Sequence, residues 1–240
     1  MKSQNTLGKL YLIPTTMGDC DPMDVLPQTI KRAIDLIDYY IVENEKTARK
    51  SIKQVQPEKK QSELILFALN KRTEIQEHKE FIKPLLEGKD MGLMSEAGCP
   101  GVADPGAVIV KLAHEKGIQV VPLVGPSSIL LAMMASGMNG QSFTFHGYLP
   151  IEKGEKKANL KVLEKISQER NQSQIFIETP YRNNKMLEDL LQILNPETHL
   201  CIAADITLST EYIKTKKAKD WKKETVDLHN RPAIFIIHKM

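Results

Sequence analysis

Residues 91–106 read MGLMSEAGCPGVADPG, in which a short apolar run is followed at once by a loop rich in glycine and proline. The run of residues 91–94 has the length and apolarity of a buried strand. Ten of the thirteen glycines lie between Gly88 and Gly147, so the backbone makes its close approaches in the middle of the chain. In an open α/β sheet, ligands bind beyond the carboxyl ends of strands. We therefore expect the binding site to include the loop of residues 95–106.

Short apolar runs alternate with helical periodicity along the chain, which predicts βα units, a mainly parallel sheet and the α/β class. The predicted strands are residues 10–13, 39–42, 64–69, 91–94, 118–121, 143–146, 174–177, 199–203 and 233–237. The predicted helices cover about residues 24–37, 46–56, 73–88, 104–116, 126–136, 155–167 and 183–194. Asp24 is predicted to cap the first helix, and Asp104 the helix that Gly117 closes.

Pro122 and the pair Gly125-Pro126 interrupt the periodicity. This break predicts two domains, residues 1–123 and 124–240.

The composition, with 41% hydrophobic and 26% charged residues, is typical of a globular protein rather than a disordered chain or a fibre. The longest apolar stretch, residues 118–135, is interrupted by glutamine, proline, glycine and serine, so no membrane span is expected. No apolar segment with a cleavage site lies near residue 1, which predicts a cytoplasmic protein. Three widely spaced cysteines and histidines without ligand spacing predict reduced thiols and no metal site.

The net charge of +3 is too small to indicate nucleic acid by itself, but six lysines gather in residues 214–223. A solvated hairpin or loop is one interpretation of this cluster, and a nucleic-acid contact is the other. Tyr212 and Trp221 could stack on bases there, although a single tryptophan in such a segment is more often a packing anchor.

The loop of residues 95–106 offers backbone donors and acceptors and few side chains suited to covalent chemistry, which favours a polar cofactor. A tight connection without a ligand is the alternative. The chain lacks GxGxxG after its first strand and lacks GxxxxGK[ST], so ordinary dinucleotide and P-loop sites are disfavoured.

Several segments together resemble the tetrapyrrole methylase family, and in particular its subgroup of small-subunit ribosomal RNA ribose methyltransferases. The matching segments are residues 10–18 (LYLIPTTMG), 95–106, 121–128 (VPLVGPSS), 147–150 (GYLP) and 178–182 (ETPYR). Residues 43–50 match a further family motif, so the resemblance spans nearly the whole chain.

The resemblance implies two α/β domains with a cofactor cleft between them, S-adenosylmethionine as the cofactor, and a homodimer. It implies methyl transfer, with RNA or the ribosomal small subunit as the partner. The residues carried over to cofactor binding are Pro14, Thr15, Glu96, Gly98, Cys99, Ser127, Ser128, Ile177, Ala203 and Ala233.

Glu43, Glu178 and Asp205 match acidic family positions at strand ends and are the catalytic candidates, because a carboxylate can take the proton of a ribose hydroxyl. An ion pair with Arg182 or Arg49, or a helix cap, is the structural alternative for each.

The chain departs from the family pattern at Asn44, Glu96, Ala204 and Pro232. These departures concern the acceptor side more than the cofactor side. Two other functions therefore stay open: the same cofactor with a tetrapyrrole or other small-molecule acceptor, and a non-catalytic RNA-binding module whose cofactor site has decayed.

Overall fold

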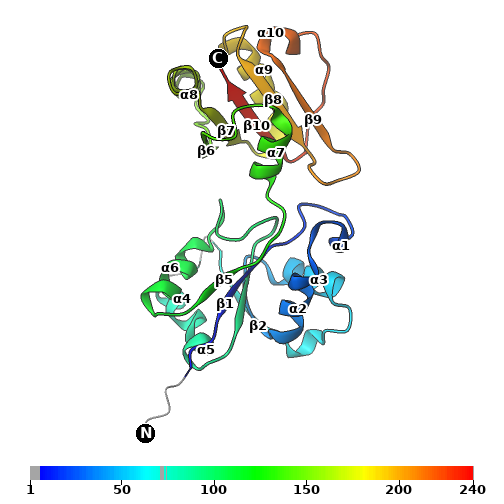
Figure 1. Ribbon diagram of the computed structural model, residues 1–240, viewed down its shortest axis with the longest axis vertical. Helices are drawn as coiled ribbons and strands as arrows, with labels where there is room; N and C mark the ends of the chain where they lie inside the picture. Colours follow the sequence, from blue (N-terminus) through cyan, green and yellow to red (C-terminus); the bar gives the residue numbers. More distant parts are fainter. Residues whose placement is uncertain (1–5, 71–72, 74, 240) are drawn as a thin grey trace. The chain divides into compact units, whose positions relative to one another are not determined.

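The computed structural model describes residues 6–70, 73 and 75–239 (Figure 1). The chain forms two compact units, Met1–Ser127 and Ser128–Met240, called unit 1 and unit 2 below. The prediction of two domains that meet between residues 123 and 124 is a separate statement about independent folding, and it stays a prediction.

Unit 1 contains a five-stranded sheet in the order β3-β2-β4-β1-β5, with every pair of neighbours parallel. The strands are β1 (Leu10–Ile13), β2 (Tyr39–Val42), β3 (Ile65–Ala68), β4 (Met91–Met94) and β5 (Val120–Pro122). All four residues of β4 are buried, as expected for a central strand of a parallel sheet whose two faces are both covered. The predicted strands of this half are confirmed, with small shifts at β3 and β5.

The helices of unit 1 follow the predicted pattern but begin at other residues. They are α1 (Pro22–Val25), α2 (Gln28–Leu36), α3 (Glu45–Val55), the 3₁₀ helix η1 (Gln61–Glu63), α4 (Ile75–Phe81), α5 (Lys83–Leu86) and α6 (Ala107–Glu115). Asp24 is not the first cap, because Asp21 accepts the Met23 N–H at 2.9 Å and Pro27 separates α1 from α2. Pro84 likewise falls in the second of two short helices where one long helix is predicted.

Asp104 does not cap α6, whose N-cap residue is Gly106. Its carboxylate instead accepts the Gly101 N–H at 2.8 Å and the Gly106 N–H at 2.7 Å. The side chain thus fixes the end of the glycine-rich loop rather than the first turn of the helix.

Unit 2 contains a mixed sheet in the order β6-β7-β10-β8-β9 (Figure 1). Its strands are β6 (Phe143–Tyr148), β7 (Ser173–Ile177), β8 (His199–Ala204), β9 (Tyr212–Lys217) and β10 (Ala233–His238). Only β6 and β7 are parallel, so the prediction of mainly parallel strands is right for unit 1 and wrong here. The helices are α7 (Ser128–Ser136), α8 (Lys153–Arg170), η2 (Pro180–Arg182), α9 (Asn183–Ile193) and α10 (Ala218–Trp221).

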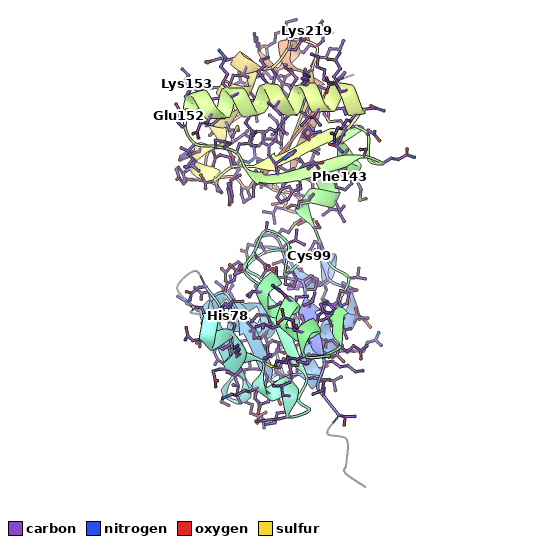
Figure 2. The ribbon with its side chains drawn as sticks, turned by 90° about the vertical axis from the view of Figure 1, so that its left-hand side faces the viewer. His78, Cys99, Phe143, Glu152, Lys153 and Lys219 are labelled. Carbon is purple, nitrogen blue, oxygen red and sulfur yellow. The ribbon has the colours of Figure 1, made fainter. Side chains whose placement is uncertain are left out.

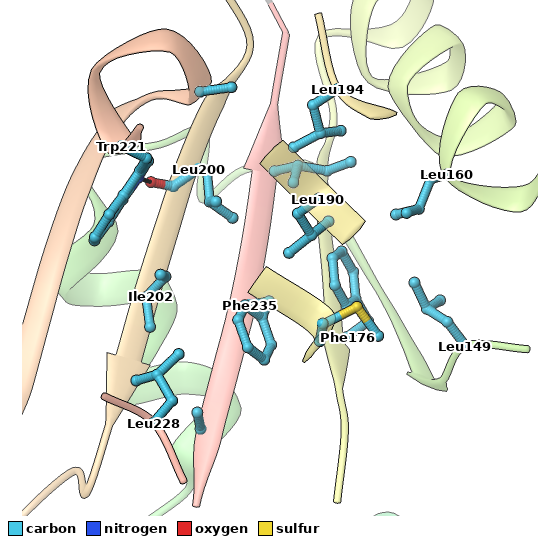
Figure 3. Close-up of a cluster of buried hydrophobic side chains, with 14 of the residues drawn as sticks. Leu149, Leu160, Phe176, Leu190, Leu194, Leu200, Ile202, Trp221, Leu228 and Phe235 are labelled. Atoms are coloured by element: carbon cyan, nitrogen blue, oxygen red, sulfur yellow. Dashed lines mark hydrogen bonds between the residues drawn. The ribbon is translucent and has the colours of Figure 1, made fainter. Parts of the chain in front are cut away.

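One face of the unit 2 sheet carries the hydrophobic cluster drawn in Figure 3. The rings of Phe176 and Phe235 stack with centroids 5.9 Å apart. Trp221 is 1% exposed and donates its indole N–H to the Leu200 carbonyl at 2.8 Å. Trp221 is therefore a packing anchor, and its ring is not available for stacking on a base.

Across residues 6–70, 73 and 75–239, every helix is too short or too polar to cross a bilayer. Cys20, Cys99 and Cys201 are free thiols.

Candidate functional site

Three loops of unit 1 lie against one another beyond the carboxyl ends of β1, β4 and β5. Thr15 donates its N–H to the Gly98 carbonyl at 3.0 Å, which links the loop after β1 to the loop after β4. The Thr15 hydroxyl adds a bond to the Ser95 carbonyl at 3.3 Å. The Cys99 thiol donates to the Pro126 carbonyl at 3.3 Å, which adds the third loop (Figure 2). Four residues that the resemblance assigns to the cofactor, Pro14, Thr15, Gly98 and Cys99, are thus brought together.

Glycine is required at two of these contacts. A Cβ on Gly125 would lie 2.2 Å from the Cβ of Pro14, so a larger residue would push the two loops apart. Gly98 has φ +71° and a Cβ there would lie 3.3 Å from the Pro126 carbonyl oxygen. Gly101, at φ +81°, faces open space instead. Gly98 therefore permits the close contact between loops, and Gly101 leaves space that a ligand can approach.

A hollow of about 230 Å³ opens beside these loops, between them and the first turns of α3. Its size is below the roughly 300 Å³ at which pockets for whole small molecules begin, so it has room for only part of a ligand. Its lining residues are Thr15, Thr16, Met17, Gly18, Asp19, Thr47, Ala48, Lys50, Ser51, Gln54, Ser95, Glu96 and Ala97.

Glu96 and Glu43 are joined at the edge of this hollow. The Glu96 N–H donates to Glu43 Oε1 at 3.2 Å, and Glu96 Oε1 accepts the Thr47 hydroxyl at 2.5 Å. The family has aspartate at position 96, and the additional methylene lets the carboxylate of Glu96 reach α3. Asn44, where the family has aspartate, caps α3, since its Oδ1 accepts the Lys46 N–H at 2.9 Å. Thr47 is not among the residues predicted from the sequence. Its position three residues after Asn44, the N-cap of α3, was the feature of the sequence that could have pointed to it.

Burial raises the pKa of the Glu43 carboxyl group, and the nearby carboxylates of Asp104 and Glu96 raise it further against the lowering effect of the Glu96 N–H. The pKa of Asp104 is also raised by burial, although the N–H groups of Gly106 and Gly101 oppose this. No salt bridge to Glu43 occurs among the described residues. A half-buried carboxylate with a raised pKa is a better proton acceptor than an ordinary surface glutamate.

Glu178 is held in an ion pair in unit 2. Its Oε1 lies 2.6 Å from the Arg182 guanidinium and also accepts the Thr179 N–H at 2.6 Å. Burial alone would raise the pKa of Glu178, but the hydrogen bonds from Arg182 and Thr179 outweigh it and lower the pKa. The ion-pair alternative is therefore realised for this residue.

Asp205 is paired as well, with a partner that was not predicted from the sequence. Its Oδ2 accepts Arg231 Nε at 2.7 Å and the Thr210 hydroxyl at 2.9 Å. Arg49, the other expected partner of an acidic candidate, donates instead to the Gln61 carbonyl at 2.5 Å. Each of the two unit 2 candidates is thus neutralised by an arginine.

The cofactor residues expected in unit 2 also gather at one edge of its sheet. Ile234 pairs with both Ile177 and Ala203, and the preceding Ala233 pairs with Ala204. Ala204 is fully buried in the hydrophobic cluster, so an arginine there would need a different local packing. The Pro232 carbonyl accepts the Asp205 N–H at 2.9 Å, which ties the start of β10 to the end of β8.

The lysine cluster of residues 214–223 is largely ion-paired. Glu224 pairs with Lys214 and Lys216, and Glu197 pairs with Lys217 and Lys219. The paired lysines lower the pKa of Glu197, to about 2. The segment forms the edge strand β9, which pairs antiparallel with the preceding strand β8, and helix α10. Of the hairpin and the loop, the hairpin is therefore right, and much of its charge is offset.

Unit 1 is a parallel sheet covered by helices, with glycine loops packed beyond its carboxyl edge, and unit 2 is a mixed sheet with helices. This combination places the chain in the α/β class. The chain matches the family of tetrapyrrole (corrin/porphyrin) methylases over residues 9–221, and it belongs to this family. The predicted fold class and the prediction of a methyltransferase are confirmed.

Curated relatives share this assignment. The ribosomal RNA small subunit methyltransferase I of Vibrio cholerae serotype O1 is 32% identical over 85% of this chain and 67% of its own length. The protein of the same name from Buchnera aphidicola subsp. Schizaphis graminum is 31% identical over 99% of this chain and 80% of its own.

Solved structures of low sequence identity have the same fold. The methyltransferase CobJ is 16% identical, with a TM-score of 0.64 over 97% of this chain and 94% of its own. A uroporphyrin-III C-methyl transferase from Thermus thermophilus, solved with S-adenyl homocysteine, is 15% identical. Its TM-score is 0.55 over 97% of this chain and 98% of its own.

Proposed function

We propose that this protein transfers a methyl group from S-adenosylmethionine to a ribose 2′-hydroxyl of small-subunit ribosomal RNA. The relatives named above are small-subunit ribosomal RNA methyltransferases, and the sequence resembles their subgroup along nearly its whole length. The observation that carries the proposal is the contact between the loops of residues 14–15, 95–101 and 125–126 in unit 1.

The residues of these loops fit the cofactor. Gly98 and Gly101 both take positive φ, and a Cβ on Gly101 would meet nothing within 4 Å, so the loop leaves room for a polar nucleoside beside it. Pro14, Thr15, Gly98 and Cys99 would hold it in unit 1. Glu96, Ser127, Ser128, Ile177, Ala203 and Ala233 complete the proposed contacts.

When bound, S-adenosylmethionine supplies a methyl group on a positively charged sulfur, which reacts by in-line displacement. The protein then has to align the acceptor oxygen with that methyl group, and alignment alone is worth several powers of ten in rate. As the oxygen–carbon bond forms and the sulfur–carbon bond breaks, the hydroxyl proton has to leave.

Glu43 is the proposed acceptor of that proton. It lies one hydrogen bond from the glycine loop, its pKa is raised by burial, and the described residues give it no cationic partner. Glu178 and Asp205 are weaker candidates, since a carboxylate bound to a guanidinium is a poor base. Their proposed role is to fix the loops at the edge of the unit 2 sheet.

The resemblance also supports a homodimer and a cytoplasmic location. Light scattering coupled to size-exclusion chromatography tests the first, and cell fractionation the second.

Methyl-labelled S-adenosylmethionine with separate acceptors tests the function. The acceptors are small ribosomal subunits, large subunits and a uroporphyrinogen. We expect label only in the RNA of the small subunit, in an alkali-resistant dinucleotide, because a 2′-O-methyl group blocks cleavage of the next phosphodiester. Label in the tetrapyrrole would assign a small-molecule acceptor, and no label with bound RNA would favour a non-catalytic module.

A further inference from the structure

Two exposed tyrosines lie at the carboxyl ends of β6 and β7 in unit 2. Tyr148 is the last residue of β6 and pairs in register with Ile177, the last residue of β7. Tyr181 follows β7 within the 3₁₀ helix η2. Each tyrosine is 61% exposed, whereas Phe176 in the same sheet is fully buried. The two rings therefore take no part in the core of unit 2.

The backbone is shaped to present these rings. The pairing of β6 with β7 shifts register between Phe145 and Tyr148, and Gly147 between them has φ +66°. Such irregularities in a strand re-aim the side chain that follows. Pro180 restricts the backbone just before Tyr181.

Arg182 packs over one of the two tyrosines. Its guanidinium carbon lies 5.3 Å from the centre of the Tyr181 ring. Tyr148 pairs in register with Ile177, and the next residue, Glu178, binds Arg182, so Tyr148 and the Glu178–Arg182 pair lie at the same end of the sheet. The Glu178 side chain is 2% exposed, so it anchors the guanidinium from below. A fixed arginine loses little rotamer freedom when a ligand arrives.

The charge and shape of this group decide its ligand. Because Glu178 neutralises Arg182, the group offers two flat rings and a guanidinium plane with little net charge, which suits a neutral aromatic ligand better than a phosphate. Bases of single-stranded RNA stack on tyrosine and arginine planes in this way, and bases inside a duplex are not accessible to do so. The lysine cluster is not an extension of this surface. Lys217 pairs with His199 at the start of β8, which is parallel to β7, and so lies at the other end of the sheet.

We propose that Tyr148, Tyr181 and Arg182 form a platform on which unpaired bases of the RNA acceptor stack. The proposal rests on the proposed function in that the ligand is RNA, and it assigns to unit 2 a part of the acceptor contact that none of the cofactor residues supplies. Tyr148, Tyr181 and Arg182 are called the stacking platform below.

Binding of the full-length protein to purified small ribosomal subunits, measured by sedimentation, tests the platform. Tyr148→Ala and Tyr181→Ala should each weaken binding about fivefold to hundredfold, the loss associated with one stacked base. Tyr148→Phe and Tyr181→Phe keep the rings and should bind as the wild type does. Arg182→Lys keeps the charge but loses the plane, and it should also weaken binding.

Phe143→Ala is the matched control, because Phe143 is an exposed aromatic residue at the opposite end of β6 (Figure 2). Its binding should be unchanged, and circular dichroism checks that all variants fold. If the wild type binds subunits and the alanine variants bind equally well, the stacking platform is refuted, but the proposal that small-subunit RNA is the acceptor is not. If the wild type does not bind subunits, the stacking platform and the RNA acceptor are both refuted. Tyrosine-dependent binding that survives nuclease digestion of the subunits would overturn the assignment to RNA bases.

Discussion

Replacing Gly98 with alanine separates the backbone strain of the glycine loop from its contact with the neighbouring loop. Gly98 and Gly117 have nearly equal φ values, +71° and +69°. A left-handed backbone costs an L residue about 1–2 kcal/mol, so both alanine variants should lose that much stability. For a chain of this size the loss lowers the melting temperature by roughly 2–8 °C.

The two positions differ in the atoms that an added Cβ would contact. At Gly117 nothing lies within 4 Å, whereas at Gly98 the Pro126 carbonyl oxygen lies at 3.3 Å and must shift by a few tenths of an ångström. The Gly98 carbonyl also accepts the Thr15 N–H at 3.0 Å, so the shift reaches the loop after β1. We expect Gly98→Ala to bind S-adenosylmethionine about tenfold or more weakly by calorimetry, a loss of about 1.4 kcal/mol. Gly117→Ala should bind as the wild type does. Equal affinity of the two variants would refute the reasoning.

Three further predictions concern single side chains. Glu43→Gln should lower kcat by about a hundredfold to ten-thousandfold; the wild-type rate should fall as pH drops through the raised pKa of Glu43, and the variant should lack that limb, so an unchanged pH profile would count against the role as base. The lowered pKa of Glu178 means that its contribution to stability is present above its unfolded pKa and is lost as pH falls through the folded value. Glu178→Gln should therefore cost roughly 1–3 kcal/mol at pH 7 and progressively less in thermal melts as the pH falls through the lowered pKa; a cost that does not change with pH would contradict the ion pair with Arg182. Trp221→Phe should cost about 1–3 kcal/mol through the lost bond to Leu200 and leave RNA binding intact, whereas weakened binding with unchanged stability would contradict its burial.

The strands of unit 1 were predictable because they are short apolar runs bounded by turn residues. β4 is buried on both faces and reads as a continuous apolar segment, MGLM, before a glycine loop. The cap residues were less predictable, since Asp21 and Asp24 both precede helical residues and only Pro27 decides between them. Proline's missing N–H and its preference for the first helical turn were the usable signal.

β9 was not among the predicted strands, because its lysines suggest a solvated hairpin or loop. Tyr212, Ile213 and Thr215 are good strand formers, and the strand forms because β8 supplies a partner for its whole length. Glu224 and Glu197, which offset the charge, lie outside the lysine run. No local pattern could reveal these pairs.

The loop of residues 95–106 was predicted as a binding site from its glycines and its place after a strand, and the resemblance added the loops after β1 and β5. The contacts between these loops came from the structure. Position alone placed Glu43, Glu178 and Asp205 at strand ends, but only the contacts distinguish Glu43 from the two carboxylates that bind arginine. The stacking platform could not be predicted, because the sequence does not say which of the tyrosines are exposed.

Thermal denaturation of the full chain with and without saturating S-adenosylmethionine tests whether the glycine loop of unit 1 is a cofactor site. At about a hundred times the dissociation constant, a ligand that binds only the folded protein stabilises it by roughly 2.7 kcal/mol. We expect the melting temperature to rise by about 5–10 °C for the wild type and by clearly less for Gly98→Ala at the same cofactor concentration. No shift for the wild type, together with no heat of binding in calorimetry, would contradict the assignment of a cofactor-dependent methyltransferase.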